Sequence, residues 1–246
     1  IDTIVIAVGG RGKRIVGDLK KRGIKKSKTF LTLNGKPILS YLIDMSLALN
    51  FQKIFLLSSY YEYELHAYLR ENYPTTKQII PVYGGKLGRK WGVPWLLYSI
   101  RRKLLKPFIY SDGNILYDKG ILKKIKNTTT LKPSLANVVL SHKDLAPTHS
   151  QFILQQGRIN LINTRLPYNK KEEGHLGGQR YYSLGLMALS ESIFSFVPNF
   201  AHKKDLDFII HDIFRSEKHL TKATVYNGNW VTIHTIRDVD KLGIKM

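Results

Sequence analysis

Apolar runs that predict strands alternate with helical patterns through the first 110 residues of the chain. The first run, residues 3–8, is continuous and β-branched, which is typical of a strand buried on both faces. Further strands are expected at residues 53–57, 78–82 and 108–110, separated by helices at 38–49, 60–71 and 93–105. This alternation predicts a parallel sheet with right-handed crossovers and a ligand at the carboxyl ends of its strands.

From about residue 136 the pattern changes, because the expected strands now come in pairs. The runs are ANVVLSHK, QFILQQGRINLIN with a turn at Gln156, and YYSLGLMALS. A helix at 205–215, the segment KATVYNGNWVTIHT and a short helix from Asp238 follow. We expect a single-domain, three-layer α/β/α fold. Its mostly parallel, Rossmann-like mixed sheet should carry a small antiparallel substrate-binding extension.

The composition supports a folded chain. Of its 246 residues, 43% are hydrophobic and 11% are aromatic, which argues against disorder. No apolar run approaches the roughly 18 residues of a membrane helix, and no secretory signal pattern is present. The chain has no cysteine, so disulfides and thiolate metal sites are excluded. We therefore expect a protein of the reducing cytoplasm that neither spans a membrane nor is secreted.

The charge of the chain is strongly unbalanced. It carries 39 Lys and Arg against 18 Asp and Glu, a formal net charge of +21. A field of this sign attracts anions, whether nucleotides, sugar phosphates, nucleic acids or acidic lipids. The charge alone does not choose among them, and a basic surface that is merely solvated is equally compatible with it.

Glycines follow the first expected strand directly, in the segment GGRGKR. Gly9, Gly10 and Gly12 would let the main chain approach a ligand without Cβ atoms in the way. Lys13 and Arg14 add positive charge at the same place. The segment matches neither the P-loop nor the G-x-G-x-x-G dinucleotide fingerprint. Phosphate binding is one interpretation, and a plain strand-to-loop turn is the other.

The segment KTFLTLNGKPILSYLID comes next, after a spacer rich in bases. Together the two segments resemble the amino-terminal signature of the sugar-1-phosphate nucleotidyltransferase family, G-G-x-G-x-R, a spacer, then P-K-x-L-x-x-x-x-G-K-P-x-L. Arg14 falls on the signature arginine and Lys28 on the signature lysine, with Ser27 in place of the proline. The resemblance implies that the glycines and Lys13 bind a nucleotide. It also implies that Arg14 and Lys28 hold the triphosphate and promote departure of pyrophosphate.

Later segments resemble the same family in the same order. KLGRKWGVPWLL is similar to its L-G-T-x-G-A-L loop, so Gly88 and Gly92 are implied to bind the nucleotide. HLGGQRYYSLGLM loosely resembles the sugar-binding strand and implies that Gly185 binds the acceptor. NGNWVTIHTIRDVDKL is similar to the closing segment. The resemblance thus implies a nucleotide-binding half at 1–135 and an acceptor-binding half at 136–246.

The magnesium site that the resemblance implies is altered in this sequence. FIYSDGNILYD resembles the central strand end whose aspartate holds Mg²⁺, but in a strict alignment that aspartate is Asn114. The second aspartate becomes Thr232, with His234 at the next inward position. Asp112 and Asn114 lie two residues apart and would point the same way on a strand. We expect Asp112 to bind Mg²⁺ with help from Asn114 and His234, and a purely structural His234 is the alternative.

These features predict an enzyme that transfers an NMP group from a nucleoside triphosphate to a sugar 1-phosphate or related phosphomonoester, with release of pyrophosphate. Its pathway would be activated-sugar or surface-polysaccharide synthesis. The altered metal positions leave a second hypothesis open, a non-catalytic nucleotide- or polyanion-binding protein of the same fold. Nucleic-acid binding is a third hypothesis, with no recognition motif behind it. The sequence does not indicate the base, the acceptor or the oligomeric state.

Overall fold

The structure is a computed structural model of the whole chain. It describes residues 1–10, 15–23, 27–128, 133–142, 150–156, 158–163, 179–203, 205–233, 235–241 and 243. The predicted site residues Gly12, Lys13, Arg14 and His234 lie outside these ranges.

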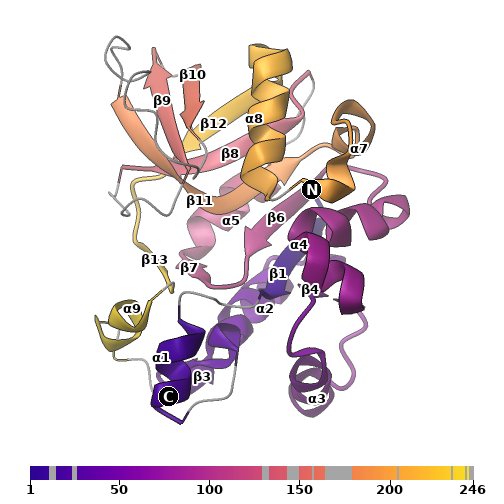
Figure 1. Cartoon of the computed structure of the whole chain (residues 1–246), viewed down its shortest axis with the longest axis vertical. Coiled ribbons are helices and arrows are strands. Elements are labelled where there is room, and N and C mark those ends of the chain that lie inside the picture. The colour runs from indigo at the N-terminus through magenta and orange to yellow at the C-terminus, as the bar shows by residue number, and fades with distance from the viewer. Residues whose placement is uncertain are drawn as a thin grey trace.

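A parallel sheet forms the centre of the fold (Figure 1). Its strands are β5 (Ile79–Tyr83), β4 (Lys53–Ser58), β1 (Thr3–Gly9) and β6 (Phe108–Asp112), in that spatial order. All three pairings between them are parallel, so their carboxyl ends lie along one edge. The α/β class and the mixed, mostly parallel sheet expected from the sequence are confirmed.

Helices cover both faces of this sheet. The helices α2 (Ile38–Ala48), α3 (Glu62–Asn72) and α5 (Lys119–Lys126) pack on one face, against Ile4 and Ile6 of β1. The helices α4 (Gly85–Ser99), α7 (Ile193–Phe196) and α8 (Leu206–Ser216) pack on the other, where Val5 of β1 points. Side chains of a strand alternate between the two faces of the sheet, so a strand that is covered on both faces needs a continuous apolar run. The first strand has such a run.

The second half of the chain extends the sheet. The strands are β8 (Ala136–Ser141), β9 (Gln151–Gln155), β10 (Arg158–Asn163), β11 (Gln179–Leu189) and β12 (Thr221–Val225). The long strand β11 joins the two parts, since its final residues pair with β6 and its first residues pair with β9. Its register shifts between Ser183 and Met187, around Gly185 with φ +72°. This irregularity turns the extension away from the parallel sheet.

Shorter elements complete the described fold. A two-strand pair of β2 (Thr32–Leu33) and β3 (Lys36–Pro37) turns at Asn34 and Gly35. Strand β13 (Trp230–Thr232) pairs with β7 (Ile115–Tyr117). The remaining elements are α1 (Val16–Lys21), α9 (Ile236–Lys241) and the 3₁₀ turns η1 (Lys28–Phe30), η2 (Arg101–Lys103), η4 (Phe200–His202) and η5 (Lys218–Leu220).

The helix predicted at 93–105 differs from the one observed. Helical structure already begins at Gly85, within the segment predicted to be a loop, and α4 ends at Ser99. The backbone breaks at Gly92, with φ 71° and ψ −151°, a combination that is essentially restricted to glycine. Pro94 lies in the first turn after this break, where a missing N–H costs little. The prediction missed this helical turn because its glycines lower the helix propensity of the segment.

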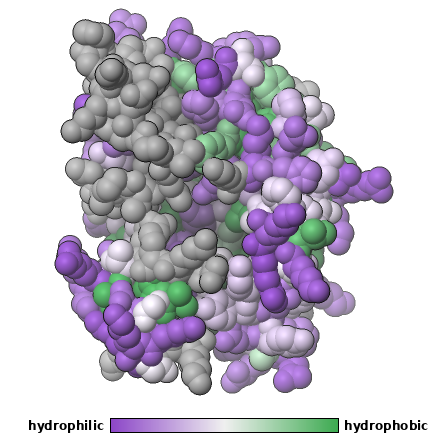
Figure 2. All heavy atoms as spheres, viewed as in Figure 1, coloured by the Kyte–Doolittle hydropathy of each residue, from purple (hydrophilic) through white to green (hydrophobic). Residues whose placement is uncertain are grey.

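The surface of the view in Figure 2 is mostly hydrophilic outside its grey atoms, in keeping with the high content of lysine and arginine. Among the described residues, none of the helices has the length and apolar character needed to cross a bilayer.

Candidate active site

The carboxyl edge of the parallel sheet brings three chain segments together. Gly10 follows β1, Ser59 follows β4, and Asp112 ends β6. The register pairs Ala7 with Asp112 and Gly9 with Ser58, so these strand ends are direct neighbours. In an open α/β sheet this edge is where ligands bind.

A cavity of about 270 Å³ opens at this edge, between β1, β4 and α4. Its lining includes Gly10, Gly88 and Gly92, three of the glycines predicted to bind a nucleotide. The structure therefore brings together residues that are about 80 positions apart in the sequence. The volume of this cavity is just below the range of about 300–1,000 Å³ that is typical of small-molecule sites.

Arg89 contributes the positive charge on the wall of this cavity. Its Nε donates a hydrogen bond to the backbone oxygen of Ser59 at 2.9 Å. Its guanidinium lies 5.6 Å from the centre of the Tyr60 ring. Because both contacts come from the segment that follows β4, the guanidinium is held beside the cavity and can attract an anionic ligand.

Lys28 lies in a turn that is fixed to the end of β1. The hydroxyl of Thr29 donates to the backbone oxygen of Val8 at 3.2 Å, and it also lies 3.1 Å from the hydroxyl of Ser27. Both hydroxyl residues are buried, with exposed fractions of 1% and 3%. These contacts hold the turn, and with it the backbone of Lys28, next to the strand end that carries Gly9 and Gly10. Sequence reasoning missed the anchoring role of Thr29.

Asp112 is held between two neighbours. The hydroxyl of Tyr110 donates to Asp112 Oδ1 at 2.6 Å. Burial, and then the nearby Asp112 carboxylate, raise the pKa of the Tyr110 phenol well above its usual value, so the phenol stays protonated as a donor. On the other side, a Cβ added to Gly185 would lie 2.5 Å from Asp112 Oδ2. Tyr110 lies two residues before Asp112 on one strand, a spacing that could have identified it.

Asn114 and Thr232, the two altered metal positions, bond to one another. Asn114 Nδ2 donates to Thr232 Oγ1 at 3.2 Å and to the backbone oxygen of Ile233 at 3.1 Å. The backbone N–H of Ile233 donates to the backbone oxygen of Asn114 at 3.0 Å. Both polar side chains are buried, with exposed fractions of 5% and 8%. The pair fastens β13 to the segment that follows β6.

The described residues offer one carboxylate at the predicted magnesium site, Asp112. Mg²⁺ is often bound by one or two carboxylates together with substrate phosphates, so Asp112 fits such a role. The hydrogen bond to the backbone oxygen of Ile233 identifies the Asn114 nitrogen as the donor, because a carbonyl only accepts, so Asn114 could ligate a cation only through its amide oxygen. Within the described ranges, no group of three or more His, Asp or Glu side chains could hold a metal ion by itself.

Comparisons with known proteins agree on the fold. No protein-family profile and no curated protein sequence matches the chain. Among solved structures, a protein from Bacillus anthracis assigned as a glucose-1-phosphate thymidylyltransferase matches with a TM-score of 0.75 and 13% identity, over 98% of this chain and 93% of that one.

Two further solved structures match over the same share of the chain. The inositol-1-phosphate CTP transferase from T. maritima has a TM-score of 0.74 and 15% identity, over 98% of this chain and 94% of that one. HddC from Yersinia pseudotuberculosis has a TM-score of 0.72 and 20% identity, over 98% of each chain. The chain therefore has the fold that these three structures share.

Proposed function

We propose that this protein is a nucleotidyltransferase. It transfers an NMP group from a nucleoside triphosphate to a sugar 1-phosphate or related phosphomonoester and releases pyrophosphate. The observation that carries the proposal is the cavity at the carboxyl edge, where Gly10, Gly88 and Gly92 meet beside the strand that ends in Asp112. The fold of the structural neighbours supports the same reaction class.

The reaction needs no nucleophile from the protein. An oxygen of the acceptor phosphate attacks the α-phosphorus, the bond from that phosphorus to the bridging oxygen breaks, and the electron pair leaves on pyrophosphate. The acceptor is already ionised, so the protein's task is alignment and neutralisation of the charge that develops. Lys28 and Arg14 are the cations proposed for this task.

Asp112 would hold Mg²⁺ together with the triphosphate. When bound, the ion supplies charge stabilisation at the phosphates during transfer. The chain's own residues fix the carboxylate for this role: Tyr110 donates to one oxygen, and Gly185 leaves space for the other. We propose that the pair of Asn114 and Thr232 has a structural role, because it joins β13 to the site without a charge.

The test is release of pyrophosphate from each of four nucleoside triphosphates with magnesium and a panel of sugar phosphates. Replacing Lys28 by Ala should lower turnover about a hundredfold, because a preorganised donor to developing charge contributes about 2–4 kcal/mol. The matched control is Lys53→Ala, which removes an exposed lysine at the opposite end of β4. Near-normal turnover in the Lys28 variant would refute the role assigned to that residue.

A second function, nucleotide binding without catalysis, is favoured by one observation. The two positions that resemble metal-binding aspartates form a neutral, buried hydrogen bond. If triphosphates bind at the edge cavity but no pyrophosphate appears across the panel and several divalent ions, this second function replaces the first.

A further inference from the structure

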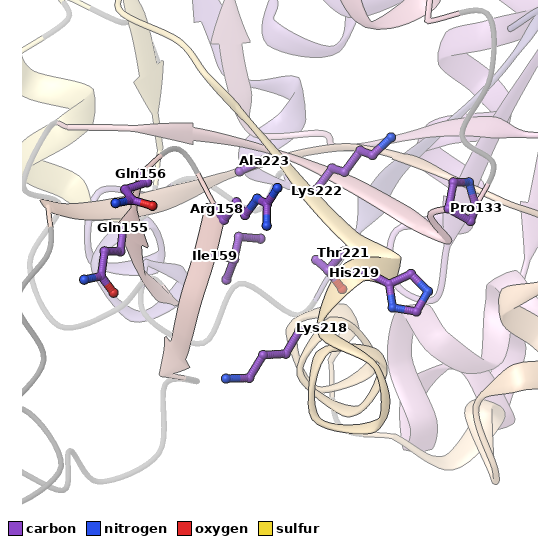
Figure 3. A pocket seen from close by; sticks show the side chains of 10 residues that line it. All are labelled: Pro133, Gln155, Gln156, Arg158, Ile159, Lys218, His219, Thr221, Lys222 and Ala223. Carbon is purple, nitrogen blue, oxygen red and sulfur yellow. The ribbon is translucent and has the colours of Figure 1, made fainter.

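A larger cavity lies in the second half of the chain, at the end of the fold opposite α1 and α9 (Figure 1). The sheet bends at β11 so that its two outer strands, β10 and β12, approach one another. The cavity of about 790 Å³ lies between these strands and η5 (Figure 3). Among the described residues, none of those that line the edge cavity lines this one.

The side chains around this second cavity are strongly basic. Arg158 of β10, Lys218 of η5 and Lys222 of β12 contribute to the lining, and none of the described lining residues is a carboxylate. Within the described part of the chain, no Asp or Glu oxygen lies within ion-pair distance of these three cations. The nearest acidic neighbour in sequence, Glu217, instead lies 3.4 Å from His219. Cations gathered without a counter-charge repel one another, and a bound anion would relieve that repulsion.

A buried hydroxyl in the same lining gives a second, independent indication. Thr221, the first residue of β12, is only 5% exposed. No hydrogen-bond partner for its Oγ1 exists among the described residues. Buried polar atoms nearly always have a partner. Because Oγ1 itself is covered, a ligand in the cavity could supply that partner only after the Thr221 side chain rotates toward it. Figure 3 shows Thr221 on the wall between Arg158 and His219.

We propose that this second cavity is a binding site for a small phosphorylated compound that also carries hydroxyl groups. Its phosphate would meet Arg158 and Lys218, and a polar atom of the ligand would bond to Thr221 Oγ1. The amides of Gln155 and Gln156, also in the lining, can bond to hydroxyl groups. The volume lies within the range of small-molecule sites, which favours a compact ligand over a polymer. The site is independent of the proposed transfer reaction.

The test uses the full chain with two probes, inorganic phosphate and ribose 5-phosphate, in calorimetric titrations and ¹⁵N spectra. Ribose 5-phosphate should bind more tightly than phosphate and shift the amide signals of β12. The double variant Arg158→Ala with Lys218→Ala should lose at least about tenfold in affinity for this site, since charge-assisted hydrogen bonds are the stronger kind. Lys28→Ala should leave the shifts of β12 unchanged, which separates this site from the edge cavity.

Two more variants keep the proposal falsifiable. Thr221→Val keeps the side-chain shape and should weaken ribose 5-phosphate roughly three- to tenfold through the lost hydrogen bond. Arg102→Ala with Lys103→Ala removes two exposed cations from η2 and should change the affinity less than about twofold. The proposal is overturned if the Arg158 and Lys218 variant binds like the wild type. It is also overturned if β12 responds to heparin but to neither small probe.

Discussion

Replacing Gly185 by Ala tests whether the position of the Asp112 carboxylate controls turnover. The new Cβ would lie 2.5 Å from Asp112 Oδ2 and 2.9 Å from its Cγ. An ordinary carbon contact begins near 3.4 Å, so the carboxylate must move by 3.4 − 2.5, or about 0.9 Å. The hydrogen bond from Tyr110 to Oδ1, now 2.6 Å, resists that movement.

The variant also carries a backbone cost. Gly185 has φ +72°, and a left-handed conformation costs a residue with a Cβ about 1–2 kcal/mol. Gly35→Ala is the matched control, because Gly35 has φ +77° but no atom within 4 Å of an added Cβ. Both variants should therefore unfold at lower denaturant concentration, and Gly185→Ala by the larger amount, because its Cβ also displaces the Asp112 carboxylate. The displaced carboxylate is the difference between them.

The expected effect on the reaction follows from the displacement. A misplacement of about 1 Å at a catalytic site can lower the rate about a hundredfold. Pyrophosphate release should thus fall by about this factor in Gly185→Ala and stay within about threefold of the wild type in Gly35→Ala. Urea denaturation checks the stability of both variants. If Gly185→Ala is destabilised but keeps its turnover, Asp112 does not have the role proposed here.

Three further perturbations have defined outcomes. Thr29→Val removes the hydrogen bond to the backbone oxygen of Val8 and should lower the free energy of unfolding by about 1–2 kcal/mol, measured by urea denaturation. It should also lower turnover, because the turn that carries Lys28 is held less firmly. Unchanged turnover would contradict this link between the turn and the reaction. Asn114→Asp should destabilise the fold by about 1–3 kcal/mol at pH 7, because a carboxylate cannot donate to a backbone oxygen, and an unchanged melting temperature would argue against the pair's structural role. The Tyr226 hydroxyl, followed by backbone bonds at the start of α5, holds the pKa of Asp118 below its usual 3.8. Stability from this ionised group is therefore present above pH 3.8 and lost as pH falls through the lower folded pKa, so acid denaturation of Asp118→Asn should lack that loss.

Local patterns were sufficient for most elements of the fold. The run at residues 3–8 became β1, and the helices expected at 38–49 and 205–215 formed as α2 and α8. These features are determined by residues that are close in the sequence, so they can be predicted from the sequence alone. The helix that begins at Gly85 was missed, because its stability comes from packing and not from its residues' propensities.

The candidate site was accessible from the sequence only in part. The glycines were predicted individually, and the structure shows that Gly10, Gly88 and Gly92 line one cavity. The i, i+2 spacing of Tyr110 and Asp112 on one strand was a usable signal for their contact, whereas the bond from Thr29 to Val8 joins residues 21 positions apart and has no such local signal. The hydrogen bond between Asn114 and Thr232 spans 118 positions and could not be inferred from either residue alone.

The sequence by itself determined that this chain alternates strands and helices, that a glycine-rich turn follows its first strand, and that its charge favours anionic ligands. Those properties are local or compositional, so they need no tertiary contacts. Only the tertiary structure decided that a buried hydrogen bond occupies the altered metal positions, and that three basic residues and Thr221 line one cavity. Both arrangements depend on which segments are adjacent in the folded chain. This adjacency is set by the topology of the fold and by packing between residues that are far apart in the sequence.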